Sequence, residues 1–376
     1  MPLLNRIATA TVALASVTAA GLTMTPAASA APAARPAFLA HFHKIRNIAS
    51  TVPANGDINP YGVAVVRQSR GRLRRGDVLV SNFNNAKNLQ GTGTTIVEIS
   101  PGGHRSQFAR ISAGQLPGKC PGGVGLTTAL VALRGGWVVV GSLPSTDGTA
   151  TTAKAGCLIV LNSQGNVAET ITGYGINGPW DATAVQRGRT ADVFVTNVLN
   201  GTVKAGGAVV HRGTVVRLRL RLATHRPPQV IGAATIGSGF AEQTNAAAFV
   251  IGPTGLGLGR NGTLYVADTS ANRITAISHA VTRRSTAGTG SVVTVNGLLN
   301  SPLGLAVAPG GDVLTVNGGD GLIVETTPGG AQVAKRQLDK SGSPAGAGAL
   351  FGLAIAPHGA GVYFVDDAAN TLRLLH

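Results

Sequence analysis

The hydrophobic positions of this chain fall into short runs that recur in the same order, most clearly in residues 252–277, 300–326 and 350–375. Each copy has a small apolar run, a Gly-containing turn, a β-branched run, a polar loop and a third apolar run. One copy reads PTGLGLG from Pro253, TLYVADT from Thr263 and NRITAI from Asn272. Such runs between turn residues predict strands, and a repeat of about 50 residues with three or four strands is typical of a propeller blade.

Six such units can be placed along the chain. A single unit cannot bury both faces of its sheet, so the repeat predicts a closed ring. We expect an all-β fold, a six-bladed β-propeller that forms one domain over residues 41–376, with blades that begin near residues 59, 121, 177, 252, 300 and 349. A fourth, outer strand is expected in five blades, at 104–111, 167–172, 229–236, 292–295 and 332–338.

The sixth blade has no sequence left for a fourth strand, because the chain ends at His376. The run HFHKIRNIA at 41–49 is strand-like and belongs to no blade. We expect it to pair with residues 371–375 and to close the ring in the last blade, since pairing the two ends removes an exposed sheet edge.

The first 30 residues have the pattern of a signal peptide. Arg6 precedes an apolar region from Ile7 to Met24, and Ala28-Ser29-Ala30 is an A-x-A cleavage site. A short segment, 31–40, then leads into the propeller. We expect an exported protein, secreted or in the periplasm or cell envelope, with no membrane span after cleavage. The alternative is an uncleaved anchor, because no charged residue lies between Arg6 and Arg35.

Cys120 and Cys157 are the two cysteines of the chain, and their spacing fits no metal-binding motif. Export places them in an oxidising compartment. Both belong to the second blade, at the same face of the ring, so we expect them to form a disulfide.

The segment TLYVADTSANRITAI at 263–277 resembles the NHL-repeat group of six-bladed propellers, and the resemblance extends over roughly residues 40–376. Propellers of this kind include gluconolactonase-type hydrolases, streptogramin-type lyases, peptidyl-hydroxyglycine lyases and binding modules, so the resemblance implies a fold and no single reaction. Gluconolactonase-type enzymes have amide and carboxylate metal ligands on their inner strands. The matching positions here are aromatic, aliphatic or hydroxyl residues: Tyr61, Thr128, Trp180, Thr254, Leu303 and Phe351.

One face of the ring is expected to carry the long loops of the first three blades, 84–93, 143–155 and 198–212. Long loops in compact folds often carry function, although loop growth without function is the alternative. Tyr61, Trp180 and Phe351 lie near the channel mouth on this face and are candidates for binding a sugar, an aromatic group or an apolar ligand. The alternative is that they pack between neighbouring inner strands.

Acidic residues offer candidates for catalysis or cation binding. Asp181 occupies the glycine position of its blade, which would place a carboxylate near the channel mouth, and Glu242 is a candidate general base. Aspartates at the ends of second strands are expected to cap turns. Asp320, Asp366 and Asp367 are also candidate ligands for a divalent cation, although we expect no cofactor.

Charge adds a second candidate surface on the opposite face. Without residues 1–30 the chain has 30 basic and 15 acidic residues, a net charge of +15. Acidic wall polymers, lipid head groups or polysaccharides are therefore plausible partners. A basic patch lies in the first blade, unless it is simply a solvated loop: Arg67, Arg70, Arg72, Arg74 and Arg75. Nucleic acid is not expected, because the patch has no interleaved aromatic residues.

The leading hypothesis is an exported propeller that binds a protein, glycan or small molecule through the loop-rich face of blades one to three, without catalysis. One alternative is a lyase or hydrolase with a site at the channel mouth. The other is a structural protein of the cell envelope that binds acidic polymers.

Overall fold

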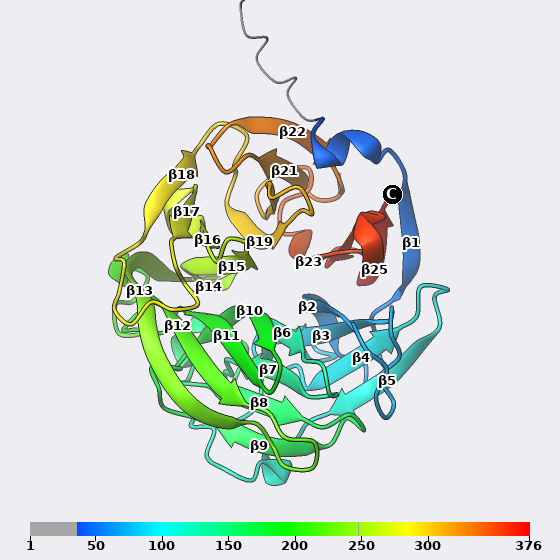
Figure 1. Cartoon of the computed structure of the whole chain (residues 1–376), viewed down its shortest axis with the longest axis vertical. Coiled ribbons are helices and arrows are strands. Elements are labelled where there is room, and N and C mark those ends of the chain that lie inside the picture. Colours follow the sequence, from blue (N-terminus) through cyan, green and yellow to red (C-terminus); the bar gives the residue numbers. More distant parts are fainter. Residues whose placement is uncertain (1–35, 247) are drawn as a thin grey trace, which may run out of the picture. The chain divides into compact units, whose positions relative to one another are not determined.

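The computed structural model describes residues 36–246 and 248–376, which contain 25 strands in six antiparallel sheets and five short 3-10 helices (Figure 1). Each sheet is one blade of a six-bladed propeller, as the repeat predicts. The predicted signal peptide, residues 1–30, lies outside the described residues. No helix within the described part of the chain has the length and apolar character to cross a membrane.

The blades follow one another in chain order. Blade 1 has β2 (Ile58–Val65), β3 (Val78–Asn84), β4 (Thr95–Ile99) and β5 (Arg105–Arg110), and blade 2 has β6 (Leu126–Ala132), β7 (Val138–Ser142), β8 (Cys157–Leu161) and β9 (Val167–Ile171). Blade 3 has β10 (Pro179–Arg187), β11 (Thr190–Asn197), β12 (Val210–Arg221), β13 (Gln229–Asn245) and β14 (Phe249–Ile251). Blade 4 has β15 (Pro253–Leu258), β16 (Leu264–Asp268), β17 (Arg273–Ile277) and β18 (Ser291–Val295).

Blade 5 has β19 (Pro302–Val307), β20 (Val313–Asn317), β21 (Leu322–Thr326) and β22 (Gln332–Gln337), and blade 6 has β23 (Leu350–Ile355), β24 (Val362–Asp366), β25 (Thr371–Leu375) and β1 (Ile45–Ser50). The 3-10 helices are η1 (Phe38–His41), η2 (Ala113–Gln115), η3 (Ala150–Thr152), η4 (Thr269–Ala271) and η5 (Pro357–Gly359).

Glycine recurs on the inner strands because neighbouring backbones meet there. A Cβ atom on Gly304 would lie 2.0 Å from the carbonyl oxygen of Phe351, and one on Gly352 would lie 2.1 Å from that of Tyr61. Side chains do not tolerate such distances, so glycine permits the close approach. The glycine in the repeat therefore marks where adjacent blades touch around the axis.

Burial follows the position of each strand within its blade. The second and third strands are sandwiched between neighbouring blades, and β3, β4, β7 and β8 are buried along their whole length. The outer strand β22 alternates between half-buried and exposed residues, as expected for a strand with one face in solvent. The hydrophobic core is thus distributed between the blades.

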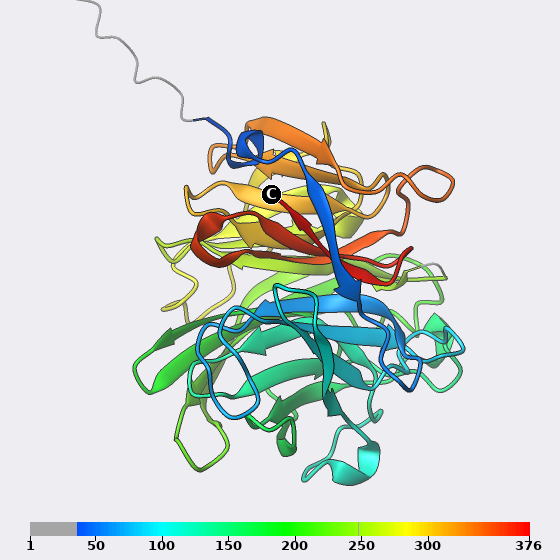
Figure 2. The same ribbon diagram turned by 90° about the vertical axis from the view of Figure 1, so that its right-hand side faces the viewer.

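The N-terminal strand closes the ring as predicted. β1 pairs antiparallel with β25, with Ile45 opposite Leu375 and Ser50 opposite Thr371, and Figures 1 and 2 show it along the outer side of blade 6. The strand begins at Ile45 and not at His41, because residues up to His41 form η1. The backbone N–H groups of Phe38 and Leu39 donate to the Glu325 carboxylate at 2.7 and 2.8 Å, which fastens η1 to blade 5.

Blade 3 differs from our expectation. Its outer strand was expected at 229–236, but β13 continues to Asn245 and β14 pairs back onto it. The cause is the length of β12, whose first residue, Val210, lies opposite Glu242 and extends the ladder. Glu242 is therefore a strand residue.

The cysteines form the predicted disulfide, with 5.2 Å between the Cα atoms of Cys120 and Cys157. Replacing both by serine should lower the free energy of unfolding by about 2–5 kcal/mol, because the bond restricts the unfolded chain. Urea denaturation of this double variant and the wild type, without reductant, measures the difference. Equal unfolding free energies would show that the bond does not stabilise the blade.

Ring closure predicts the effect of removing β1. Deleting residues 36–50 should lower the melting temperature and cause aggregation that grows with protein concentration, because β25 becomes an open sheet edge. Calorimetry and light scattering test this. A truncated protein that stays monomeric, with the melting temperature of the full protein, would contradict the role of β1.

Candidate functional site

The long loops of blades 1 to 3 lie on one face of the ring and are joined by hydrogen bonds. The backbone N–H of Ser145 donates to the carbonyl of Gly91 at 3.0 Å, and its hydroxyl donates to that of Gln90 at 2.6 Å. The backbone N–H of Gly156, at the end of the blade 2 loop, donates to the carbonyl of Asn177 at 2.6 Å, and the side-chain amide of Asn177 donates to Asn200 in the blade 3 loop at 2.6 Å. We call this the loop-rich face. Its loops form a continuous ordered layer over one mouth of the central channel.

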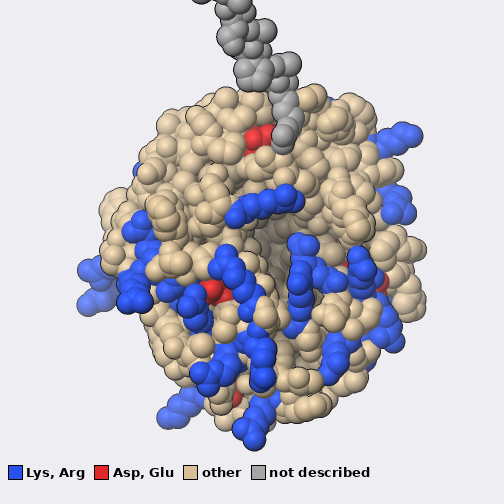
Figure 3. All heavy atoms as spheres, in the orientation of Figure 1, with Lys and Arg blue, Asp and Glu red and all other residues tan. Residues whose placement is uncertain are grey.

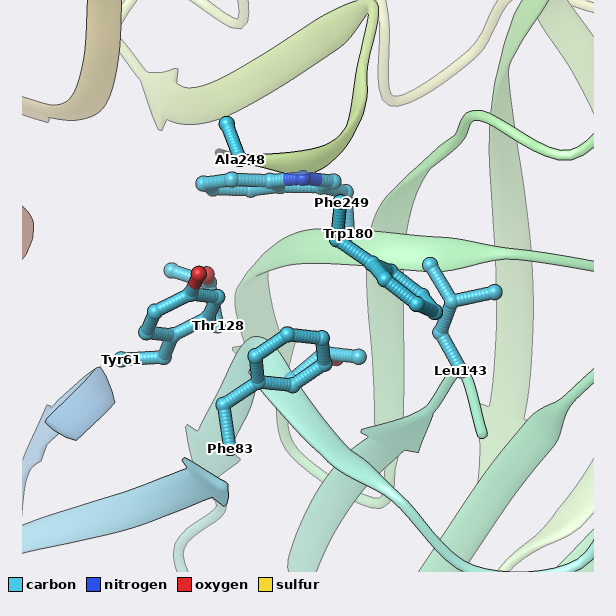
Figure 4. Close-up of a pocket in the computed structure, with 8 residues that line it drawn as sticks. Tyr61, Phe83, Thr128, Leu143, Trp180, Ala248 and Phe249 are labelled. Atoms are coloured by element: carbon cyan, nitrogen blue, oxygen red, sulfur yellow. The ribbon is translucent and has the colours of Figure 1, made fainter. Parts of the chain in front are cut away.

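Under this layer an aromatic cluster fills the channel mouth. The Tyr61 ring stacks on Phe351 with 4.0 Å between centroids and on Phe83 with 4.5 Å, and it lies 5.9 Å from Trp180. Phe249 packs edge-on against Phe83 at 5.4 Å. Figure 4 shows the rings of Tyr61, Phe83, Trp180 and Phe249 around the space between them. The repeat indicated Tyr61, Trp180 and Phe351, but not Phe83 and Phe249, which come from a second strand and from β14.

The space left between these rings is small. The cavity has a volume of about 10 Å³ and is lined by Tyr61, Phe83, Thr127, Thr128, Leu143, Trp180, Ala248 and Phe249. That volume holds at most one water molecule. Trp180 is only 5% exposed, and its indole N–H donates to the carbonyl of Val250 at 3.0 Å. These contacts favour packing over an open ligand pocket, and no acid, histidine or cysteine lines the cavity.

Asp181 connects two blades. Its carboxylate accepts the N–H of Ala182 at 2.8 Å and the N–H of Leu256, on the inner strand of blade 4, at 2.9 Å. Burial raises the pKa of this carboxyl to about 7, against the lowering effect of the two N–H groups. The side chain occupies a glycine position, as the sequence indicates, but it is buried and points into the joint between β10 and β15, not into open space.

Glu242 also fixes local structure. The residue is fully buried, and its carboxylate accepts the backbone N–H of Asn200 at 3.0 Å and the side-chain amide of Asn200 at 3.4 Å. Burial raises the pKa of Glu242 to about 7. We suggested Glu242 as a loose general base. The structure instead places it as the anchor of the long loop of blade 3.

The aspartates at the ends of second strands pair with the following strand. Asp366 lies 2.9 Å from Arg373, and Asp268 lies 2.8 Å from Arg273. Asp320 lies in the loop after β20, not at the end of that strand, and its carboxylate accepts the N–H of Leu322 at 3.1 Å. Within residues 36–246 and 248–376, no three His, Cys, Asp or Glu side chains are grouped so that they could hold a metal ion.

Asp367 differs from these aspartates, because none of the hydrogen bonds and ion pairs seen in the described residues involves its carboxylate. Burial, and then the nearby negative charge of Asp366, raise its pKa to about 7. Burial also raises the pKa of the Tyr61 hydroxyl, and the Asp367 carboxylate raises it further. Asp367 therefore lies near Tyr61 on the loop-rich side.

The opposite face of the ring is formed by the loops after the first and third strands of the blades. In contrast to the loop-rich face, these loops carry a large net positive charge. Eleven arginines lie in these loops: Arg67, Arg70, Arg72, Arg74, Arg75, Arg134, Arg189, Arg226, Arg260, Arg283 and Arg284. The same loops contain two acids, Asp77 and Asp312, and the segment that leads into β1 adds one lysine, Lys44, whose backbone N–H donates to the carbonyl of His376 on this face. We call this the arginine face. Figure 3 shows Lys and Arg side chains gathered around a hollow at its centre.

The loop-rich face is close to neutral in comparison. Its loops contain five lysines and five aspartates and no arginine in the described residues: Lys87, Lys119, Lys154, Lys204, Lys340, Asp57, Asp147, Asp320, Asp339 and Asp367. The net positive charge of the loops is therefore confined to one face. In the sequence, only the five arginines of blade 1 stand out as a cluster.

Three arginines of this face occupy equivalent positions. Arg67, Arg134 and Arg260 each come two residues after the end of an inner strand, β2, β6 or β15, and all three are exposed. Alignment of the blades in the sequence could have revealed this position. Five of the six inner strands, all except β10 of blade 3, end at these loops in a half-buried residue: Val65, Ala132, Leu258, Val307 and Ile355. The channel is thus more open at the arginine face than at the aromatic cluster.

Arg72 has a structural part in the basic patch. Its guanidinium donates to the carbonyl of Gln107 at 2.6 Å, to that of Phe108 at 3.3 Å and to that of Gln164 at 3.4 Å. Gln107 and Phe108 belong to blade 1 and Gln164 to blade 2. Arg72 therefore joins two blades. The guanidinium of Arg74 instead donates to the carbonyl of Gly71 within its own loop, at 2.7 Å, and Arg67, Arg70 and Arg75 are exposed.

Comparison with known proteins supports the fold. No family model and no curated protein sequence matches the chain. A gluconolactonase from Xanthomonas campestris superposes with a TM-score of 0.52 at 13% identity, covering 91% of this chain and 98% of that one. A streptogramin B lyase gives 0.51 at 14%, covering 89% and 97%. Regucalcin from Agrobacterium tumefaciens, a calcium-binding protein, gives 0.54 at 12%, covering 88% and 93%. At such identities the similarity establishes the propeller fold alone.

The raised pKa values predict how stability depends on pH. Asp181, Glu242 and Asp367 each have a folded-state pKa of about 7, above the unfolded-state value. The folded protein then holds protons that the unfolded chain releases, so their contribution to the unfolding free energy should fall as pH rises from about 4 to about 7.

The substitution Asp367→Asn should remove part of the fall in unfolding free energy that accompanies rising pH. The variant should be more stable than wild type at about pH 7.5 and closer to it at about pH 4.5, where the folded wild-type carboxyl is protonated. Urea denaturation at both pH values measures the difference. A variant with the same pH dependence as wild type would contradict the raised pKa of Asp367.

Proposed function

We propose that this protein is an exported, non-catalytic propeller that binds acidic polymers through its arginine face. The observation that carries the proposal is the separation of charge, with eleven loop arginines on one face and a neutral balance of lysine and aspartate on the other. The signal-peptide pattern and the disulfide support export. This function was the second alternative drawn from the sequence.

The choice of arginine is chemically informative. Guanidinium presents several N–H donors in a rigid plane and pairs with carboxylate, sulfate or phosphate through two parallel hydrogen bonds. A solvated loop that needs only charge for solubility would accept lysine equally well. Among the described residues the loops of this face contain eleven arginines, and Lys44, just before β1, is the single lysine beside them, which favours recognition of planar or multidentate anions over simple solubility.

The distribution of arginines suits a polymer better than a single small anion. Arg67, Arg134 and Arg260 come from blades 1, 2 and 4, so they repeat around the ring and not within one loop. A chain of negative charges can contact several such positions at once, and each added contact raises the total affinity. The positive field of the whole face also speeds the approach of a polyanion.

Binding of a partner through the loop-rich face is a second candidate. The specific observation in its favour is the hydrogen-bonded layer formed by the long loops of blades 1 to 3. The contact surface would then be the outside of that layer, because Tyr61, Trp180 and Phe351 are buried beneath it. A lyase or hydrolase site at the mouth is less favoured, since Asp181 and Glu242 both hold backbone groups.

Two triple variants with equal charge change separate these candidates. The triple variant Arg67→Glu, Arg134→Glu and Arg260→Glu should bind an acidic polymer column more than about tenfold more weakly than the wild type. In a rising salt gradient the wild type should therefore elute after this variant, because more salt is needed to screen its contacts. The matched control is Lys87→Glu, Lys154→Glu and Lys204→Glu on the loop-rich face. It should elute close to wild type, because its charges lie beyond the screening length of about 8 Å from the bound polymer.

The alternatives give different results in the same experiment. Equal weakening by both triple variants would mean that net charge, and not the arginine face, determines binding. Loss of binding only in the lysine variant would favour the loop-rich face. Wild-type protein that does not bind any acidic polymer at low salt would contradict the proposed function.

A further inference from the structure

An open cleft lies between blades 1 and 2 and differs in chemistry from the rest of the arginine face. Its volume is about 510 Å³, and it is lined by Arg72, Gln107, Phe108, Ala109, Arg110, Gln115, Gln164, Gly165, Asn166 and Val167. This volume falls within the range of known ligand sites. The lining has four carboxamide side chains and two guanidinium groups and no acidic side chain.

We propose that this cleft selects a polysaccharide that contains uronic acid units. The inference rests on the proposed function: the arginine face supplies general affinity for acidic polymers, and the cleft supplies the chemical preference among them. A uronic acid unit presents hydroxyl groups, which both donate and accept hydrogen bonds, beside a carboxylate, which only accepts them. The cleft offers partners for both kinds of group.

The carboxamides carry the preference for sugar. Gln107 and Gln164 are exposed, and none of the hydrogen bonds found within the described residues uses their side-chain amides. Each amide can donate to one hydroxyl and accept from another. A polyphosphate chain has no donors, so it would leave the amide oxygens of the cleft unmatched. Nucleic acid is disfavoured as well, because Phe108 is 1% exposed and cannot stack on a base.

The guanidinium groups supply the charge. Arg72 is held in place by its bonds to the carbonyls of Gln107, Phe108 and Gln164. Arg110, at the other end of β5, is exposed and makes none of the ion pairs found in the described residues. A carboxylate bound by Arg110 would gain a charge-assisted hydrogen bond.

The shape of the cleft also suits a polymer. Arg72 and Gln164 lie in loops of the arginine face, whereas Arg110 ends β5 and Gln115 ends η2 toward the loop-rich face. The cleft therefore runs along the side of the ring, between the two blades. Arg72 belongs both to the arginine face and to the cleft lining, so a chain that contacts the face at Arg72 also meets the cleft.

The test uses variants that keep every charge. Gln107→Ala with Gln164→Ala removes two cleft amides, and Gln68→Ala with Gln229→Ala, two exposed glutamines outside the cleft lining, is the matched control. Affinity of the mature protein for polygalacturonate and for polyphosphate is measured by titration calorimetry at one salt concentration. The cleft variant should bind polygalacturonate about tenfold more weakly and polyphosphate within about twofold of wild type. The control should match wild type for both.

Other results overturn the inference. If the cleft variant weakens both polymers equally, or neither, the cleft does not select sugars. Wild-type protein that prefers polyphosphate would also overturn it, while leaving the arginine face as an anion-binding surface. Two other results would contradict the proposed function itself. They are wild-type protein that binds neither polymer, and a triple arginine variant that binds as tightly as wild type. Thermal unfolding of each variant confirms that the fold is retained.

Discussion

The close approach of the inner strands around the axis is the constraint on which the rest of the structure depends. Backbone meets backbone at Gly255, Gly304 and Gly352, where a Cβ atom would lie 2.0–2.2 Å from a carbonyl oxygen of the next blade. The residues that precede these positions converge on the axis as a result. Large side chains there, such as Tyr61 and Phe351, can only stack on one another. The channel is therefore filled at one mouth and more open at the other.

Much of the fold could be predicted from the sequence, because the strand pattern repeats six times and the leftover run at 41–49 matched the missing strand. The extension of β13 could not be predicted, because it depends on pairing with the long strand β12. The first residues of β12 lie in a segment whose polar sequence indicates a loop. The position of Asp181 was predictable from the repeat. Its role was not, because its partner Leu256 lies 75 residues away in the next blade.

The candidate surfaces also differ in how far they can be predicted from the sequence. Adjacent arginines in blade 1 form a visible cluster in the sequence, whereas Arg134 and Arg260 stand alone and gain meaning only when the blades are aligned. The cleft between blades 1 and 2 depends on contacts across the blade boundary, such as the bond from Arg72 to Gln164. Local sequence patterns carry no information about such contacts, which explains why the five arginines were found and the cleft was not.

Rigidity connects the fold to the proposed binding. Arg67, Arg134 and Arg260 follow inner strands that are fixed on both sides by neighbouring blades, so their backbones are already ordered before a ligand arrives. A preorganised surface loses less conformational freedom on binding than a flexible tail with the same charges. The pairing of β1 with β25 maintains this order by holding the ring closed. The closed ring thus turns dispersed arginines into a surface with fixed spacing, which a basic tail of equal charge would lack.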